Sequence, residues 1–237
     1  MTKRKHKREK AQLFHHLTQQ AKANSQSEHD APLTAAAAAT IPLLASLPES
    51  RELTKMKKFR FQLLHEWIEN RMQPGRVADV GGGKGLLAYL LQQSGWEATV
   101  IDPVNQALPA KYKDIHLNRR VKISAETSVP RINREFAPEL AAPFDLLVSM
   151  HAHGCNIQLI DVAAAAQKKV ILLPCCIIDE PLLPEPGQHW IACLVEYALA
   201  KNLVVEPFRL NFRGQNIGLY IHPPELDTDT HRFSQIN

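Results

Sequence analysis

A short glycine-rich segment is the first candidate for chemistry. Residues 77 to 85 read Val-Ala-Asp-Val-Gly-Gly-Gly-Lys-Gly, so Asp79 is followed by Gly81, Gly83 and Gly85 at alternate positions. Glycine lets a ligand approach the backbone closely, and a helix that begins behind such a loop offers unpaired N–H groups to an anion. The alternative is an ordinary tight turn, but four of the chain's 10 glycines lie within residues 81 to 85. We therefore expect this loop to bind a nucleotide-like ligand.

Spacing argues against two common phosphate-binding loops. A dinucleotide fingerprint needs a glycine three positions after Gly83, where Leu86 stands, and a P-loop needs Ser or Thr after Lys84, where Gly85 stands. The pattern resembles instead the first motif of the class I S-adenosylmethionine (SAM) methyltransferases, whose loop passes under the methionine part of the cofactor. This resemblance implies SAM as the cofactor and a Rossmann-like α/β fold.

A second acid fits the same resemblance. Asp102 ends an apolar run 21 residues after Gly81, and a carboxylate at a strand end can accept two hydrogen bonds from a ribose diol. Its alternative role is a helix cap before Pro103. The resemblance adds a looser contact near the adenine after the third strand, which we assign to Glu126, with Ser124 equally placed.

Two later apolar runs end in polar and sulfur-bearing residues. His151-Ala152-His153-Gly154-Cys155 follows the run that ends at Met150, and Pro174-Cys175-Cys176 follows the run that ends at Leu173. Ligands bind at the carboxyl ends of the strands in an open parallel sheet, so both clusters are expected to face the methyl group. Over residues 57 to 223 the chain resembles a methyltransferase subgroup with His-x-Cys-Gly and Cys-Cys motifs, which includes the tRNA acceptor-stem 2′-O-methyltransferases. His153 stands where that subgroup has its first Cys.

Three of these residues are the catalytic candidates. Methyl transfer needs in-line positioning above all, and a hydroxyl acceptor also benefits from a base, which His151 or His153 could supply near neutral pH. Either histidine could instead pack or cap a strand end. Cys175 is the candidate nucleophile for methylation of a pyrimidine ring carbon, which requires an exposed and activated thiolate. Its alternative is a small buried hydrophobic residue.

Cysteine usage predicts a reduced, cytoplasmic protein without a metal site. The chain has four cysteines in 237 residues, and adjacent Cys175 and Cys176 do not readily bridge each other. Cys155, His151 and His153 lie close in sequence, but their spacing is not one typical of zinc sites. The longest mostly apolar run, residues 35 to 47, is shorter than the ~20 residues that cross a bilayer, so we expect no membrane partner.

Apolar periodicity places the motifs on alternating strands and helices. We expect strands at residues 77–80, 98–101, 121–123, 144–150, 170–173, 203–212 and 217–221, and helices at 49–72, 85–93, 157–167 and 189–201. The last two strands are close enough in sequence to form a hairpin. The pattern predicts one α/β domain over residues 49–237, with a doubly wound, mostly parallel seven-stranded sheet whose last strand is antiparallel.

Charge separates this domain from the N-terminal segment. The formal net charge is +4, but the first ten residues hold six Lys or Arg and one Glu, so the remaining chain carries 22 basic and 23 acidic side chains. We expect residues 1–48 to form a basic arm and linker, flexible or partly helical. The arm could bind RNA through its phosphates, serve as a localisation signal or solubilise the protein.

These observations favour a SAM-dependent methyltransferase that acts on RNA, tRNA or rRNA. The alternatives are methylation of a protein or a small molecule, and a non-catalytic subunit that binds SAM or RNA. The missing subgroup Cys at His153 keeps the non-catalytic alternative open.

Overall fold

The computed structural model describes residues 3–26 and 57–225. Its helices are α1 (Lys3–Gln26), η2 (Lys57–Phe59), α3 (Arg60–Glu69), α4 (Leu86–Gln93), η3 (Pro138–Ala141), α5 (Asn156–Ala166) and α6 (Trp190–Leu199). Its strands are β1 (Arg76–Val80), β2 (Glu97–Ile101), β3 (Lys111–Lys113), β4 (Arg120–Lys122), β5 (Arg131–Ile132), β6 (Leu146–Met150), β7 (Lys169–Leu173), β8 (Val204–Arg209) and β9 (Ile217–His222). The predicted domain boundary and the apolar run at 35–47 lie outside the described residues.

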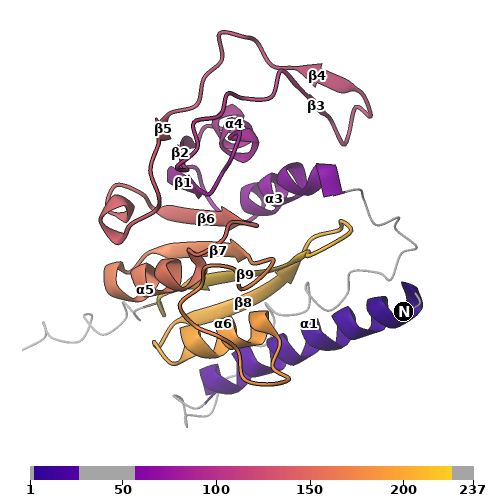
Figure 1. Cartoon of the computed structure of the whole chain (residues 1–237), viewed down its shortest axis with the longest axis vertical. Helices are drawn as coiled ribbons and strands as arrows, with labels where there is room; N and C mark the ends of the chain where they lie inside the picture. Colours follow the sequence, from indigo (N-terminus) through magenta and orange to yellow (C-terminus); the bar gives the residue numbers. More distant parts are fainter. Residues whose placement is uncertain (1–2, 27–56, 226–237) are drawn as a thin grey trace, which may run out of the picture.

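Seven strands form one sheet in the order β5-β2-β1-β6-β7-β9-β8 (Figure 1). β9 pairs antiparallel with both β7 and β8, and all the other pairs in this sheet are parallel. The predicted fold, a mostly parallel seven-stranded sheet with an antiparallel last strand, is confirmed.

Two hydrophobic clusters show that helices cover both faces of the sheet. One cluster joins α5 and α6 to side chains from one face, including Leu147 and Leu172, which are fully buried. The other joins α3 and α4 to the opposite face, where Trp67 stacks on Phe208 with ring centroids 4.0 Å apart. The central strands β6 and β7 are therefore buried on both sides, which is why they are continuous apolar runs in the sequence.

The third strand of the sheet is not the predicted one. Residues 120–122 form β4, which pairs antiparallel with β3 in a separate two-stranded hairpin. The strand beside β2 is instead β5, only two residues long, with Arg131 and Ile132 opposite Val100 and Ile101. The prediction relied on the alternation of Val121 and Ile123, but Val121 lies in a hairpin between the charged residues Arg120 and Lys122.

The basic N-terminal segment, for which a flexible or a partly helical arm was expected, is a long helix over residues 3–26. α1 packs against β8 and α6 (Figure 1), and Leu17 is fully buried in the cluster that also holds Leu13 and Phe14 at its margin. Gln20 Nε2 donates to Glu196 Oε1 of α6 at 2.7 Å. Within the part of the chain that the structure describes, none of the helices has the length and apolarity that a bilayer crossing requires.

Candidate active site

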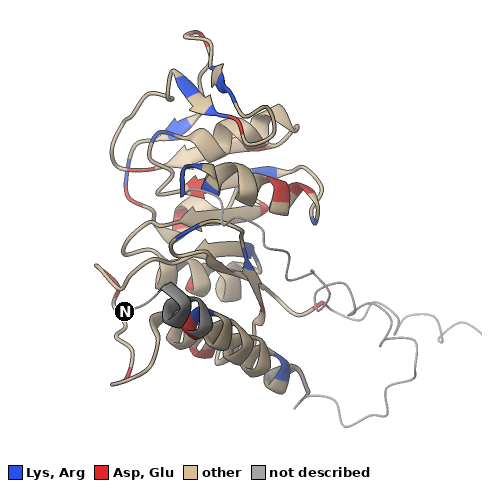
Figure 2. Ribbon diagram, turned by 90° about the vertical axis from the view of Figure 1, so that its right-hand side faces the viewer, with Lys and Arg blue, Asp and Glu red and all other residues tan. Residues whose placement is uncertain are grey.

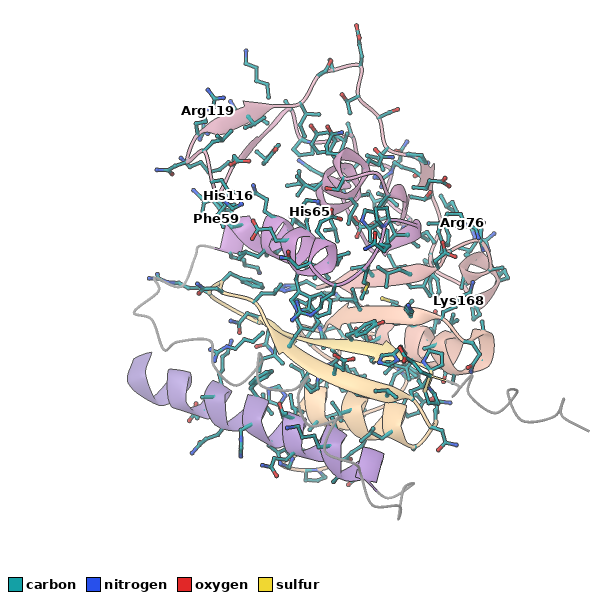
Figure 3. The ribbon with its side chains drawn as sticks, turned by 180° about the vertical axis from the view of Figure 1, so that it is seen from behind. Phe59, His65, Arg76, His116, Arg119 and Lys168 are labelled. Carbon is teal, nitrogen blue, oxygen red and sulfur yellow. The ribbon has the colours of Figure 1, made fainter. Side chains whose placement is uncertain are left out.

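The candidate residues gather at the carboxyl ends of β1, β2, β6 and β7. These strands run parallel, so their ends lie along one side of the sheet. Arg76 begins β1 and Lys168 precedes β7, and both lie on the opposite side of the molecule from Phe59 and His116 (Figure 3). The predicted clustering of the strand ends is therefore present.

The glycine loop after β1 requires glycine for its shape. Gly81, Gly83 and Gly85 have φ angles of 66°, 54° and 75°, in the left-handed region that favours glycine. A Cβ atom on Gly81 would lie 2.3 Å from Ala152 Cβ, too close for any side chain. The Gly81 N–H donates to Ile101 O at 2.8 Å, so the loop is fixed against β2 and the segment after β6.

Asp79 lies beneath this loop. Its side chain is 1% exposed, and its Oδ2 atom has no hydrogen-bond partner. Burial raises the pKa of Asp79 to about 7, and the nearby Asp102 adds to the rise, while the backbone N–H of Ala88 and the charge of Arg131 act against it. A buried carboxylate with an unpaired oxygen under a glycine loop fits a site for a cationic ligand group.

Asp102 ties the glycine loop to the end of β2. Its Oδ2 accepts from the Gly83 N–H at 2.8 Å and its Oδ1 from the Val104 N–H at 2.9 Å. A carboxylate has about four lone-pair sites, so two remain for a ribose diol. The cradle of Asp79, Asp102 and the glycines thus fits SAM, with Asp79 near the methionine part and Asp102 at the ribose.

Glu126 was expected to follow the third strand of the main sheet, and it does not. It follows β4, which is outside the main sheet, and its backbone N–H donates to Ser124 Oγ at 3.3 Å. The residue that follows the true third strand is Asn133, whose Oδ1 accepts from Arg131 Nε at 3.4 Å. In this sheet Asn133, and not Glu126, is the residue that directly follows the third strand.

His151 is held in an unusual conformation directly after β6. Its φ is 60°, its N–H donates to Leu173 O at 3.1 Å, and its ring Nε2 lies 3.1 Å from Gln215 O. Burial lowers the pKa of His151 to about 4, with further lowering by Lys57 and Arg60. The ring is therefore neutral at pH 7, and because a carbonyl only accepts, Nε2 carries the proton and Nδ1 remains an acceptor.

His153 and the two adjacent cysteines lie together beside His151. His153 is exposed, whereas Cys175 and Cys176 are partly buried. Burial, followed by the neighbouring Cys176, raises the pKa of the Cys175 thiol to about 11. At neutral pH Cys175 is thus a thiol, the opposite of the activated thiolate that a nucleophile requires.

A family model described as a methyltransferase domain matches residues 53–171, half of the chain. The chain belongs to this methyltransferase family. Its cofactor is SAM, in agreement with the glycine loop and with Asp102 at the end of β2. A comparison with curated proteins gave no match.

Three solved structures are similar to this methyltransferase at low sequence identity. The ribosomal protein L11 methylase of Lactobacillus delbrueckii subsp. bulgaricus is 22% identical, with 69% of this chain and 78% of that chain covered and a TM-score of 0.42. A TehB-like SAM-dependent methyltransferase from Corynebacterium glutamicum is 12% identical, with 70% and 87% covered and a TM-score of 0.35. CalO1, a calicheamicin biosynthesis methyltransferase solved with SAH, is 13% identical, with 71% and 54% covered and a TM-score of 0.37.

Three residues of the methyltransferase site were not predicted from the sequence. Gln215 comes from the loop between β8 and β9, and its carbonyl holds the His151 ring. Lys57 and Arg60 come from the start of the α3 region, and their charges act on His151. Loop length and helix periodicity do not indicate which distant element a residue meets, so no sequence signal pointed to these contacts.

The residues of this chain position the cofactor and the acceptor, and the cofactor supplies the reactive group. Bound SAM supplies an electrophilic methyl group on a sulfonium centre. The glycine loop, Asp79 and Asp102 would hold the cofactor, and the residues after β6 and β7 would border the acceptor. His151 is neutral at pH 7 and borders this position, but a pKa of about 4 makes its ring a weak base for an acceptor hydroxyl.

Proposed function

We propose that this methyltransferase acts on RNA, on a ribose hydroxyl of a tRNA or rRNA, as its motifs at the ends of β6 and β7 suggest. The observation that carries the proposal is a basic hairpin made of β3 and β4 and their connection, residues 111–122. It contains five cations and one acid, Asp114; the cations are Lys111, Lys113, Arg119, Arg120 and Lys122. Cations spaced along a ribbon are suited to phosphates of a nucleic-acid backbone.

The basic hairpin lies on the same side as the strand ends. His116 at its turn contacts Glu66 Oε1 of α3 at 2.7 Å, and α3 begins with Arg60, whose charge acts on His151. His116 and Arg119 lie near Phe59 and away from Arg76 (Figure 3), and Figure 2 looks onto this side with the blue hairpin at its top. An RNA that contacts the hairpin can therefore also reach the candidate site.

Lys57 and Arg60 add positive charge beside the histidine. They favour a negatively charged substrate at the site, and they lower the basicity of His151. The N-terminal end of α1, whose first eight residues include six Lys or Arg, lies on the same side as the hairpin (Figure 1). We therefore include in the proposal that the basic residues at the N-terminal end of α1 contact the RNA.

The test is transfer of labelled methyl groups from SAM to separate fractions of total RNA, protein and metabolites. We expect label in RNA. A hairpin variant with Arg119→Gln, Arg120→Gln and Lys122→Gln should raise the KM for RNA about tenfold or more at low salt, because it removes three phosphate contacts. Its affinity for SAM, measured by calorimetry, should equal that of the wild type, since Asp79 and Asp102 are unchanged.

The matched control removes a cation on the other side of the molecule. Lys169 is exposed at the first position of β7, and Lys169→Gln should leave the KM for RNA unchanged. Label only in protein or in metabolites would reject the RNA substrate and assign the alternative class. SAM binding without transfer to any fraction would favour the non-catalytic subunit.

A further inference from the structure

We propose that His153, Cys175 and Cys176 form a binding site for a soft transition-metal cation of the Zn(II) class. The ligand atoms of these three residues, one ring nitrogen and two sulfurs, all lie within 4.8 Å of one another. This spacing allows all three to reach one ion with small side-chain movements, because Zn–S and Zn–N bonds are about 2.0 to 2.3 Å long.

The three residues that lie together in the structure are not the three that are close together in the sequence. Cys155 lies near His151 and His153 in the sequence, but it is buried and contacts Ser149 Oγ at 3.4 Å. The second loop, after β7, brings Cys175 and Cys176 instead, with their sulfurs 3.5 Å apart. Both are free thiols and partly buried, so they are accessible to an ion.

A backbone hydrogen bond holds the loop after β6 against the loop after β7. The Gly154 N–H donates to Ile178 O at 3.1 Å, so the residue after His153 is joined to the segment after the cysteine pair. Gly154 has a φ of 67°, and a Cβ there would lie 3.0 Å from both Asp179 Cβ and Asp179 O. The close approach of the loops therefore depends on glycine at this position. The Cys175 thiol also donates to His151 O at 3.8 Å, which orients its sulfur.

The chemistry of the three ligand atoms determines which metal ions the site prefers. Two thiolates and one imidazole suit Zn(II) or Cu(I), whereas Mg(II) and Ca(II) prefer oxygen ligands. Two thiolates would balance the charge of a divalent ion. Three protein ligands leave a fourth position for water or another exogenous ligand, as in zinc sites that do chemistry.

Binding must displace the thiol protons. Burial and Cys176 keep Cys175 protonated at neutral pH, and the charge of Lys57 opposes this only in part. A metal ion lowers the pKa of a coordinated thiol enough to deprotonate it, so both cysteines are expected to bind as thiolates.

The experiment titrates the reduced full-length protein with Co(II) and follows thiolate-to-cobalt charge-transfer absorption. We expect one Co(II) per chain, displaced by Zn(II). Cys175→Ser and Cys176→Ser should each reduce the charge-transfer band to half or less, and His153→Gln should weaken binding about tenfold while keeping the band. The control is Cys193→Ala in α6, outside the cluster, which should titrate like the wild type.

A second measurement needs no variant. Zn(II) should protect Cys175 and Cys176, but not the other cysteines, from alkylation, as read from peptide masses. Absence of a charge-transfer band in the wild type, an equal band in Cys175→Ser, or equal alkylation with and without Zn(II) would overturn the site. None of these readouts depends on methyl transfer.

Discussion

Asp79 is the residue whose surroundings most oppose its charge. The side chain is fully enclosed beneath the glycine loop, and the carboxylate of Asp102 is close enough to raise its pKa further. A Cβ on Gly82 would lie 2.5 Å from Asp79 Cγ, so the loop lies directly on the carboxyl group. A carboxylate held this way reduces the stability of the free protein, which is a known cost of sites that bind charged ligands.

We predict that Asp79→Asn removes a contribution that lowers stability as pH rises, while the opposite contribution from the lowered pKa of His151 stays in place. The pKa of Asp79 is about 7 in the folded state, against an ordinary value of 3.8, so the folded state binds the extra proton and loses stability as pH rises between about 4 and 7. From pH 5 to pH 8 this loss is on the order of 2 to 3 kcal/mol, and the variant should lack it. Urea unfolding of the cofactor-free protein at both pH values measures the difference.

The control for this prediction is Glu97→Gln. Glu97 is an exposed carboxylate at the start of β2, so its loss should leave the difference between pH 5 and pH 8 as in the wild type. An Asp79→Asn protein that retains the full wild-type difference would show that another group carries it.

Residue types and spacing predicted which side chains meet, but not their protonation states. Asp79, Asp102, His151 and Cys175 were all found at strand ends because a parallel sheet brings its carboxyl ends together. The pKa values of Asp79, His151 and Cys175 depend on burial and on neighbouring groups, some from distant elements, such as Gln215 beside the His151 ring. A local sequence pattern carries no information about such partners.

The same limit applies at the scale of elements. β6 and β7 were predictable because strands buried on both faces must be apolar throughout. β5 was missed because two residues, Arg131 and Ile132, are too few for a periodic signal, and that error moved the adenine contact to Glu126. The length of the helix α1 was not predictable because its apolar stripe is narrow, and among its described side chains (residues 9–23) only Leu17 is fully buried.

We predict that α1 contributes to the stability of the folded unit. Leu17→Ala should lower the free energy of unfolding by about 2 to 5 kcal/mol, because it removes a fully buried side chain that packs in the α5 and α6 cluster. Gln19→Ala, at an exposed position of the same helix, should change it by about 0.5 kcal/mol or less. Urea unfolding of both variants tests this; equal stability of Leu17→Ala and wild type would mean that α1 does not dock in solution.

Across the whole molecule, positive charge is gathered at the side where the strands end. The basic hairpin, the start of α3 and the N-terminal end of α1 come from distant parts of the chain but lie on this side (Figure 1). Lys10 of α1 donates to Gly214 O in the loop between β8 and β9, next to Gln215, which holds His151. The N-terminal helix is thus linked through one loop to the candidate site.

The last prediction separates RNA contact by the arm from its docking. A variant with Lys3, Arg4, Lys5, Lys7 and Arg8 all changed to Gln keeps Lys10 and Leu17, so its free energy of unfolding should equal that of the wild type. If the five cations meet phosphates, RNA affinity should fall at low salt, and the slope of log affinity against log salt should become shallower by about 3.5 to 4.5. Filter binding over a salt series measures both, with the hairpin variant as a comparison. Wild-type affinity and slope in the arm variant would restrict RNA binding to the folded domain, because the helix would still be docked.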